Sequence, residues 1–149
     1  MNEEEKRDRQ MLELLNELRV ALPGVQILFA FLLTAPFAQG FQRITDTQKT
    51  LFYGTLLATA ASTVCLIAPS ATHRLRFHKN DRRFIIESAN TFLIVGLAFM
   101  GIAIVLAVAM VTDFLYDHWI VWVAPSAVAV ALAVFWFIRP LLRRESSGP

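Results

Sequence analysis

Ionisable side chains gather in one short segment of the sequence, and their types suggest several kinds of chemistry. Residues 72–83, THRLRFHKNDRR, carry seven basic or potentially basic side chains in twelve positions. Such a segment can hold a metal or a heme through its histidines, or it can attract anionic lipid headgroups or an acidic partner. Nucleic acid is a remote partner, because the net charge is only +2. The side chains expected to contact lipid or a partner are Arg74, Arg76, Lys79, Arg82 and Arg83.

Neither metal chemistry nor enzyme chemistry is well supported by the rest of the sequence. His73 and His78 are five residues apart and need not share a face, and no histidine lies within a long apolar run, as a heme inside a bundle would require. The single cysteine, Cys65, sits in an apolar run and leaves no intrachain disulfide and no cysteine-based metal site. Nucleophile–base pairs, phosphate loops and metalloprotease motifs are also missing. We therefore expect no enzyme activity, no metal and no cofactor.

The composition points to lipid as the solvent around this chain. Apolar residues make up 56% of the 149 residues, charged residues only 17%, and the mean hydropathy is +0.51. About 20 apolar residues cross a bilayer as a helix, and the runs are too continuously apolar for barrel strands. A single domain is predicted, with an amphipathic helix, four spans and a polar tail. These segments cover residues 4–19, then 20–41, 51–70, 84–111 and 119–138, and finally 139–149.

Prolines and tryptophans predict where the spans begin and end. Pro23 suits the first turn of the first span, Pro69 is expected to end the second, and Pro125 is expected to kink the fourth near its start. Trp119 and Trp122 stand at one end of the fourth span and Trp136 at the other. Tryptophan at both ends of a span is typical of the two interfaces of a membrane.

The basic residues predict the orientation of the spans. Four spans place both termini on one side, together with residues 72–83. Two basic residues, Arg43 and Lys49, fall on the other side, and all the remaining ones fall on the terminal side. The remaining twelve are Lys6, Arg7, Arg9, Arg19, Arg74, Arg76, Lys79, Arg82, Arg83, Arg139, Arg143 and Arg144. Lysine and arginine near span ends resist translocation. Both termini are therefore expected in the cytoplasm, and residues 72–83 are first of all a topological anchor.

Glu87 is the best candidate for a transport role. An ionisable residue within a span is a functional hypothesis by default. However, Glu87 lies near the cytoplasmic end of its span, and Arg83 precedes it by four residues, a spacing typical of a helical salt bridge. A paired interfacial carboxylate is the simpler interpretation. Gln26 and Asn90 are the other polar side chains near the spans, and both can hydrogen-bond between helices.

Two stretches together resemble a known family. LLNELRVALPGVQILFAFLLTAPF is followed about 30 residues later by APSATHRLRFHKNDR. The chain, over roughly residues 10–138, resembles a family of small four-span bacterial membrane proteins of unknown function that is common in actinobacteria. The resemblance implies fold and location but no activity. If the shared details mark a site, the residues to consider lie at one membrane face: Glu17, Arg19, Gln26, His73, Arg74 and Glu87.

The sequence thus predicts an all-α integral membrane protein, a four-helix bundle with an amphipathic helix at its N-terminus. We expect a multi-pass protein of the bacterial inner membrane, acting as a non-enzymatic accessory or interaction subunit. Its partners would be the lipid bilayer, anionic headgroups, and a second copy or another membrane protein. The alternative is a small oligomeric transporter or channel that uses polar residues near the cytoplasmic face.

Overall fold

The computed structural model describes residues 3–75, 82–116 and 119–138, and within these it does not describe the side chains of 3–8, 10, 11, 14, 72–75 and 82–87. Every element of the described residues is helical. The elements are α1 (Glu3–Thr34), η1 (Ala35–Phe37), η2 (Gln39–Arg43), α2 (Asp46–Leu75), α3 (Arg82–Leu115), α4 (Ile120–Leu132) and η3 (Ala133–Ile138). Here η1 and η2 are 3-10 turns, and η3 is a π-helical continuation of α4. The fold is the all-α four-helix bundle that the sequence predicts.

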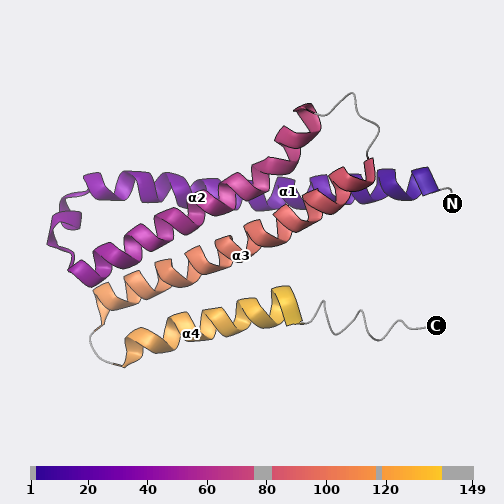
Figure 1. Ribbon diagram of the computed structural model, residues 1–149. Coiled ribbons are helices and arrows are strands. Elements are labelled where there is room, and N and C mark those ends of the chain that lie inside the picture. The colour runs from indigo at the N-terminus through magenta and orange to yellow at the C-terminus, as the bar shows by residue number, and fades with distance from the viewer. Residues whose placement is uncertain (1–2, 76–81, 117–118, 139–149) are drawn as a thin grey trace.

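Four helices are long and apolar enough to cross a membrane. These segments are Leu15–Phe37, Asp46–Ala71, Ser88–Leu115 and Ile120–Ile138. The helices run lengthwise along one another, and the beginning of α1, the end of α2, the beginning of α3 and the end of η3 lie toward one end (Figure 1). We call this the terminal end, and we call the opposite end, with the α1–α2 and α3–α4 connections, the far end. The chain is therefore a multi-pass membrane protein with four crossings.

The helices are longer and less interrupted than the sequence suggests. The amphipathic segment 4–19 and the first span form one helix, so Pro23 lies deep inside α1 rather than in a first turn. Pro69 likewise does not end α2, which continues to Leu75. In water an interior proline removes a hydrogen bond and costs about 3 kcal/mol, but membrane helices tolerate it because neighbouring groups satisfy the freed carbonyls. Residues 112–115, which lie past the predicted end of the third span at residue 111, are still part of α3.

The core sits between α1, α2 and α3. Leu18 and Val25 of α1, Leu66 of α2 and Leu93 of α3 form a buried cluster. The pair α2–α3 makes the largest packed surface, and α1 lies against both of these helices. In lipid this packing is driven by dispersion and close approach rather than by exclusion of water. These three helices therefore form the packed core of the bundle.

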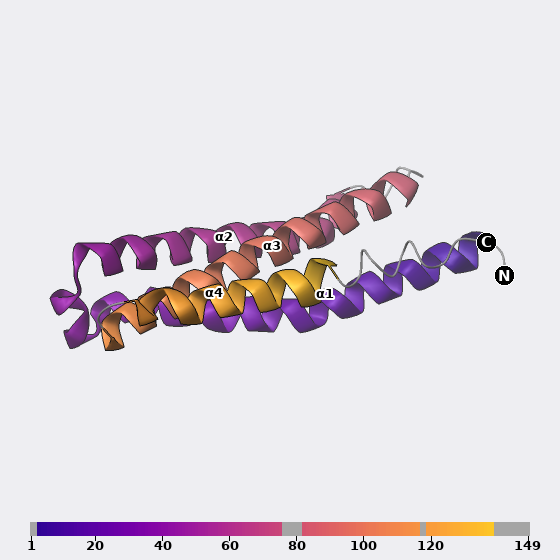
Figure 2. The same ribbon diagram turned by 90° about the horizontal axis from the view of Figure 1, so that it is seen from below.

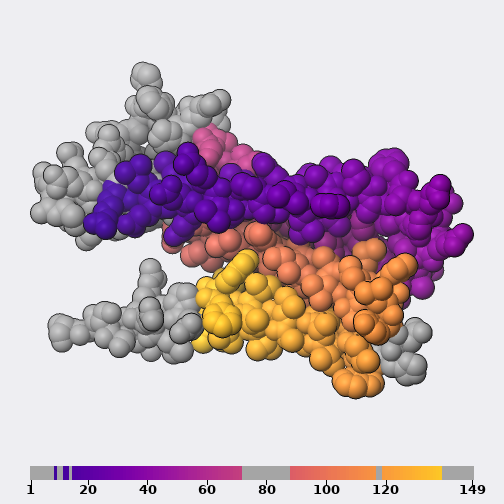
Figure 3. All heavy atoms as spheres, turned by 180° about the vertical axis from the view of Figure 1, so that it is seen from behind, coloured from indigo at the N-terminus to yellow at the C-terminus, as the bar shows by residue number. Residues whose placement is uncertain are grey.

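The fourth helix stands at the edge of the bundle. Within the described residues α4 packs on α3 alone, apart from its own continuation η3. Figure 3 shows a band of α3 left uncovered between α1 and α4, and Figure 2 shows α4 running along the other helices from a second side. Helix α4 continues through Pro125, which is its buried residue. The bundle is thus open along one side, where α3 and α4 face lipid.

Candidate functional site

A row of hydroxyl side chains fills the middle of the α2–α3 interface. Thr55, Thr59 and Ser62 are fully buried, at 0% exposure. Their spacing of four and three residues puts them on one face of α2. The Thr55 hydroxyl donates to the Leu51 carbonyl at 2.8 Å, and the Thr59 hydroxyl donates to the Thr55 carbonyl at 2.7 Å. Each threonine donor is therefore used within its own helix and is not offered to a substrate.

Ser62 instead connects two helices. Its hydroxyl donates to the carbonyl of Gly96 in α3, with an oxygen–oxygen distance of 2.7 Å. The approach is close because Gly96 has no side chain: a Cβ there would lie 2.8 Å from Leu66 Cδ2 and 3.3 Å from Cys65 Cβ. Leu66 is fully buried and has little room to move. Ser62 and Gly96 together fix the separation of α2 and α3 near mid-bundle.

A second polar contact closes the far end of the same helix pair. The backbone N–H of Thr45 donates to Gln48 Oε1 at 3.1 Å, and the N–H of Gln48 donates to Thr45 Oγ1 at 3.2 Å. This reciprocal pair is a capping box, which satisfies two backbone donors at the start of α2. The Gln48 side-chain amide then donates to Asp113 of α3, at 3.0 Å to Oδ2 and 3.4 Å to its carbonyl oxygen. One glutamine thus caps α2 and ties it to α3.

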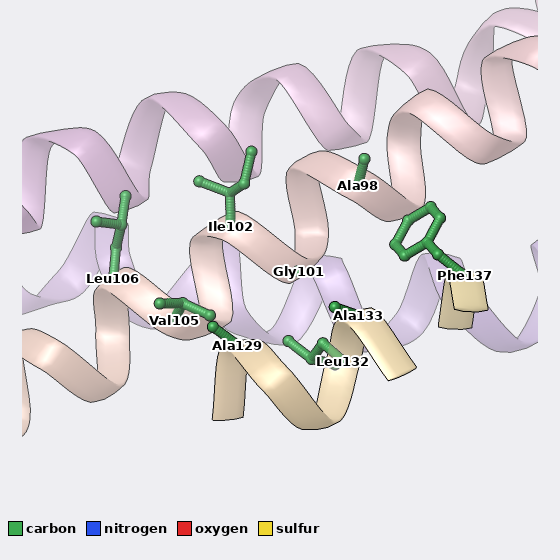
Figure 4. Close-up of a pocket in the computed structure, with 9 residues that line it drawn as sticks. All are labelled: Ala98, Gly101, Ile102, Val105, Leu106, Ala129, Leu132, Ala133 and Phe137. Atoms are coloured by element: carbon green, nitrogen blue, oxygen red, sulfur yellow. The ribbon is translucent and has the colours of Figure 1, made fainter. Parts of the chain in front are cut away.

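An apolar groove runs between α3 and α4 (Figure 4). Its volume is about 380 Å³, and it is open on one side. All the side chains around it are apolar, and they come from α3, α4 and η3. The lining residues are Ala98, Gly101, Ile102, Val105, Leu106, Ala129, Leu132, Ala133 and Phe137. Without a donor or acceptor on a lining side chain, the groove suits hydrocarbon rather than a polar substrate.

The described members of the predicted membrane-face cluster do not converge. Glu17, Arg19 and Gln26 all belong to α1, and all three are exposed. Glu17 and Gln26 are nine residues apart, which places them about 180° apart around an α-helix. One ligand therefore does not bridge these two side chains within a single copy. Asn90, near the beginning of the third span, is also exposed.

The rest of the predicted site lies outside the described side chains. His73 and Arg74 belong to the last turn of α2, and Glu87 belongs to α3, but their side chains are not among those described. The same holds for Arg82 and Arg83, and residues 76–81, which include Arg76 and Lys79, fall outside the described residues altogether. Their roles at the membrane face stay predictions.

The described residues hold no group of three or more His, Cys, Asp or Glu side chains that would bind a metal ion. Cys65 is a free thiol of intermediate exposure, beside the close approach of α2 to Gly96. The two ion pairs of the described side chains, Arg9–Glu13 and Lys49–Asp46, join exposed groups within one helix. Such pairs contribute little to stability. Gln48 and Ser62, by contrast, hydrogen-bond from α2 to α3.

The extent of the family match decides what the chain is. A family model, DUF6328, described as a family of unknown function, matches residues 2–140. The chain belongs to this family. Neither the curated proteins nor the solved structures include a match to the chain. Membership of DUF6328 confirms the predicted resemblance to a family of unknown function, and it brings no activity with it.

Two structural sites of this DUF6328 member were missed by the sequence analysis, although one carried a readable signal. Thr45 and Gln48 match the Thr-x-x-Gln pattern of a capping box immediately before an apolar run. The contact between Gln48 and Asp113 had no such signal, because the two residues are 65 positions apart. The close approach at Gly96 likewise had no local signal, because Ser62 and Gly96 are 34 positions apart.

Proposed function

We propose that this chain is a non-enzymatic accessory or interaction subunit of the bacterial inner membrane. The observation that carries the proposal is the use of polar groups inside the bundle. Across the described side chains, no buried nitrogen or oxygen lacks a hydrogen-bond partner. The hydroxyls of Thr55 and Thr59 bond to carbonyls within α2, and the hydroxyl of Ser62 bonds to α3. A pathway for a polar solute needs polar groups or water along its wall.

The outward surface supports an interaction role. Large apolar side chains cover the exposed faces of all four spans, and α4 leaves much of its surface free. Apolar side chains are expected on a surface that faces lipid, whereas exposed polar side chains within a span are not. Two such polar side chains are Gln26 in the first span and Asn90 in the third. Polar side chains directed away from their own bundle suit contacts with another transmembrane segment.

The proposed orientation places the terminal end in the cytoplasm. It rests on the twelve basic residues assigned to that end, against Arg43 and Lys49 at the far end. Basic residues near the cytoplasmic leaflet each add roughly 1 kcal/mol of attraction to anionic lipid. In a Cys65→Ala background, we expect Lys49→Cys to react with a membrane-impermeant maleimide added to intact cells. Glu13→Cys should react only after lysis, and the reverse pattern would overturn the orientation.

Native purification tests the accessory role. The chain, expressed in its own membrane at its normal level, should copurify in several mild detergents with a stoichiometric partner, either a second copy or another membrane protein. Mass spectrometry identifies the partner, and cross-linking before solubilisation preserves contacts that detergent would break. A monomer in every detergent and in the cross-linked membrane would contradict the proposal.

The second candidate is a small oligomeric transporter or channel. The exposure of Asn90 favours it, because outward polar side chains from several copies can line a shared path. Glu87 would be the ionisable group of such a path. In this case vesicles containing the chain would show a solute or proton flux that Glu87→Gln abolishes. Full flux in the Glu87→Gln variant would exclude the proposed path.

A further inference from the structure

Helix α1 carries a second packing stripe that its own bundle does not cover. The core stripe of α1 consists of Leu18, Val25 and Leu32, which are spaced by seven residues and are 5%, 0% and 8% exposed. A parallel stripe begins at Leu12 and also repeats every seven residues, through Arg19, Gln26 and Leu33. Each member of this second stripe is exposed. It lies one residue, or about 100°, around the helix from the core stripe.

The second stripe has the pattern of a coiled-coil seam. Three residues after each of its first three members comes a large apolar side chain: Leu15 is exposed, and Leu22 and Phe29 are of intermediate exposure. Leu22 also packs against the core cluster of its own bundle, so only the part that the core leaves accessible belongs to this pattern. The spacing of three and four residues repeats over residues 12–33, which is three complete heptads. Helices with apolar a and d positions pair in parallel with a left-handed crossing. We call these seven residues the α1 seam, with Leu12, Arg19, Gln26 and Leu33 at a positions and Leu15, Leu22 and Phe29 at d positions.

Gln26 places a polar amide of the α1 seam in the middle of the first span. It is the twelfth of the 23 residues of the first span, so its amide lies near the midplane of the bilayer. It forms no hydrogen bond with any side chain or backbone group that the structure describes, and its side chain is exposed. In hydrocarbon an unsatisfied amide costs several kcal/mol. A bare lipid environment is therefore a poor surrounding for this side chain.

We propose that the α1 seam pairs with the α1 seam of a second copy, forming a parallel homodimer in which Gln26 bonds with Gln26 of the second copy. A glutamine amide both donates and accepts, so two of them related by a two-fold axis satisfy each other. An axis along the membrane normal also gives both copies the same orientation. A polar residue at an a position specifies register and oligomer state, at a cost in stability.

Arg19 fits the same arrangement. It lies seven residues before Gln26, about 10 Å toward the terminal end. A long arginine side chain at this depth extends to the headgroups, so the two guanidinium groups need not meet within the seam. The dimer deepens the interaction role proposed above and rests on it, because both require the spans to lie in a bilayer.

Cysteine cross-linking tests the seam directly. In a Cys65→Ala background, Leu33→Cys should give a disulfide-linked dimer when native membranes are treated with a mild oxidant. Phe31→Cys is the matched control: Phe31 is 71% exposed, only two positions away and about 160° around the helix from Leu33. Equal cross-linking at both positions, or none at Leu33→Cys and Leu12→Cys, would overturn the proposal.

Dimer affinity tests the role of the amide. By single-molecule photobleaching in liposomes, Gln26→Ala should raise the dimer dissociation constant by about tenfold, in line with hydrogen bonds between membrane helices. Gln26→Asn should retain most of the affinity, because it keeps an amide, and Ile27→Ala should leave it unchanged. An unaltered constant in Gln26→Ala would contradict the proposal. A monomer that copurifies with a different membrane protein would refute the homodimer while leaving the interaction role in place.

Discussion

Gln48 and Asp113 are joined across the far end of the bundle, with the glutamine amide nitrogen 3.0 Å from Oδ2 of the aspartate. Gln48 is only 6% exposed, although it lies in the first turn of α2. The same side chain closes the capping box with Thr45. Two roles therefore converge on one amide: its oxygen caps the start of α2, and its nitrogen donates to Asp113 and so joins α2 to α3.

Replacement of Gln48 should destabilise the bundle more than replacement of its neighbour. Gln48→Ala removes one half of the capping box and leaves Asp113 without this donor, so we expect a loss of about 1–3 kcal/mol in unfolding free energy. Lys49→Ala breaks only the exposed Lys49–Asp46 pair and should change little. Thermal unfolding in a mild detergent measures both variants. Equal melting temperatures would show that the Gln48–Asp113 contact contributes nothing.

A charged replacement separates the two roles of Gln48. Gln48→Glu keeps an acceptor for the Thr45 N–H, so the capping box survives. It removes the donor to Asp113 and places two carboxylates at hydrogen-bond distance, so the variant should be less stable than Gln48→Ala at neutral pH. Acidification should restore stability, because protonation of one carboxyl removes the repulsion and supplies a donor. If the melting temperature of Gln48→Glu depends on pH no more strongly than that of the wild type, this account is contradicted.

Two glycines of α3 should respond in opposite ways to the same substitution. Gly96→Ala brings a Cβ to 2.8 Å from Leu66 Cδ2 and 2.9 Å from Leu66 Cγ. Leu66 is fully buried, so its side chain cannot move away without disturbing its neighbours. We expect a loss of about 1–3 kcal/mol from overpacking. Gly101→Ala is the control, since its Cβ would meet Leu132 Cδ1 at an ordinary 3.7 Å. Gly101→Ala should leave the free energy of unfolding unchanged, or raise it by up to about 1 kcal/mol, because alanine has a higher helix propensity than glycine.

The Gly96→Ala variant also tests whether the Ser62–Gly96 contact limits the separation of α2 and α3. If Gly96→Ala unfolds at the wild-type temperature, then α2 and α3 can separate at low cost, and the Ser62–Gly96 contact is not a constraint. Ser62→Ala checks this independently, because its loss should be near the roughly 0.6 kcal/mol average for hydrogen bonds between membrane helices. A larger loss in Gly96→Ala than in Ser62→Ala would show that steric fit matters more than the hydrogen bond.

Hydropathy alone predicted the number and order of the spans. In hydrocarbon the backbone groups of a segment must hydrogen-bond to one another, so a long apolar run of this kind crosses as a helix. Hydropathy predicted the bounds of the spans less well. Pro23 and Pro69 were interpreted by rules that hold in water, where an interior proline ends or kinks a helix. In this bundle both helices continue through the proline. Helix α3 likewise runs past the predicted end of its span at residue 111 to Leu115, and Gln48 donates to the Asp113 side chain near that end.

The candidate site was harder to predict than the fold. Glu17, Arg19 and Gln26 were grouped by their place near one membrane face, but Glu17 lies about 160–180° around α1 from Arg19 and Gln26, which share one stripe of the helix. The contacts that do join helices, Ser62 with Gly96 and Gln48 with Asp113, link residues 34 and 65 positions apart. Without an arrangement of the helices, no local pattern pairs such residues.

The unequal lengths of the spans make this bundle sensitive to bilayer thickness. The fourth span has 19 residues and the third has 28. At about 1.5 Å per residue these correspond to roughly 28 Å and 42 Å. A bilayer with a hydrocarbon core of about 30 Å suits the shorter helix, while the longer one must tilt or project. Within the described residues α4 packs on α3 alone. A thicker membrane would therefore strain the α3–α4 pair first, and the packing of α1 against α2 would be retained.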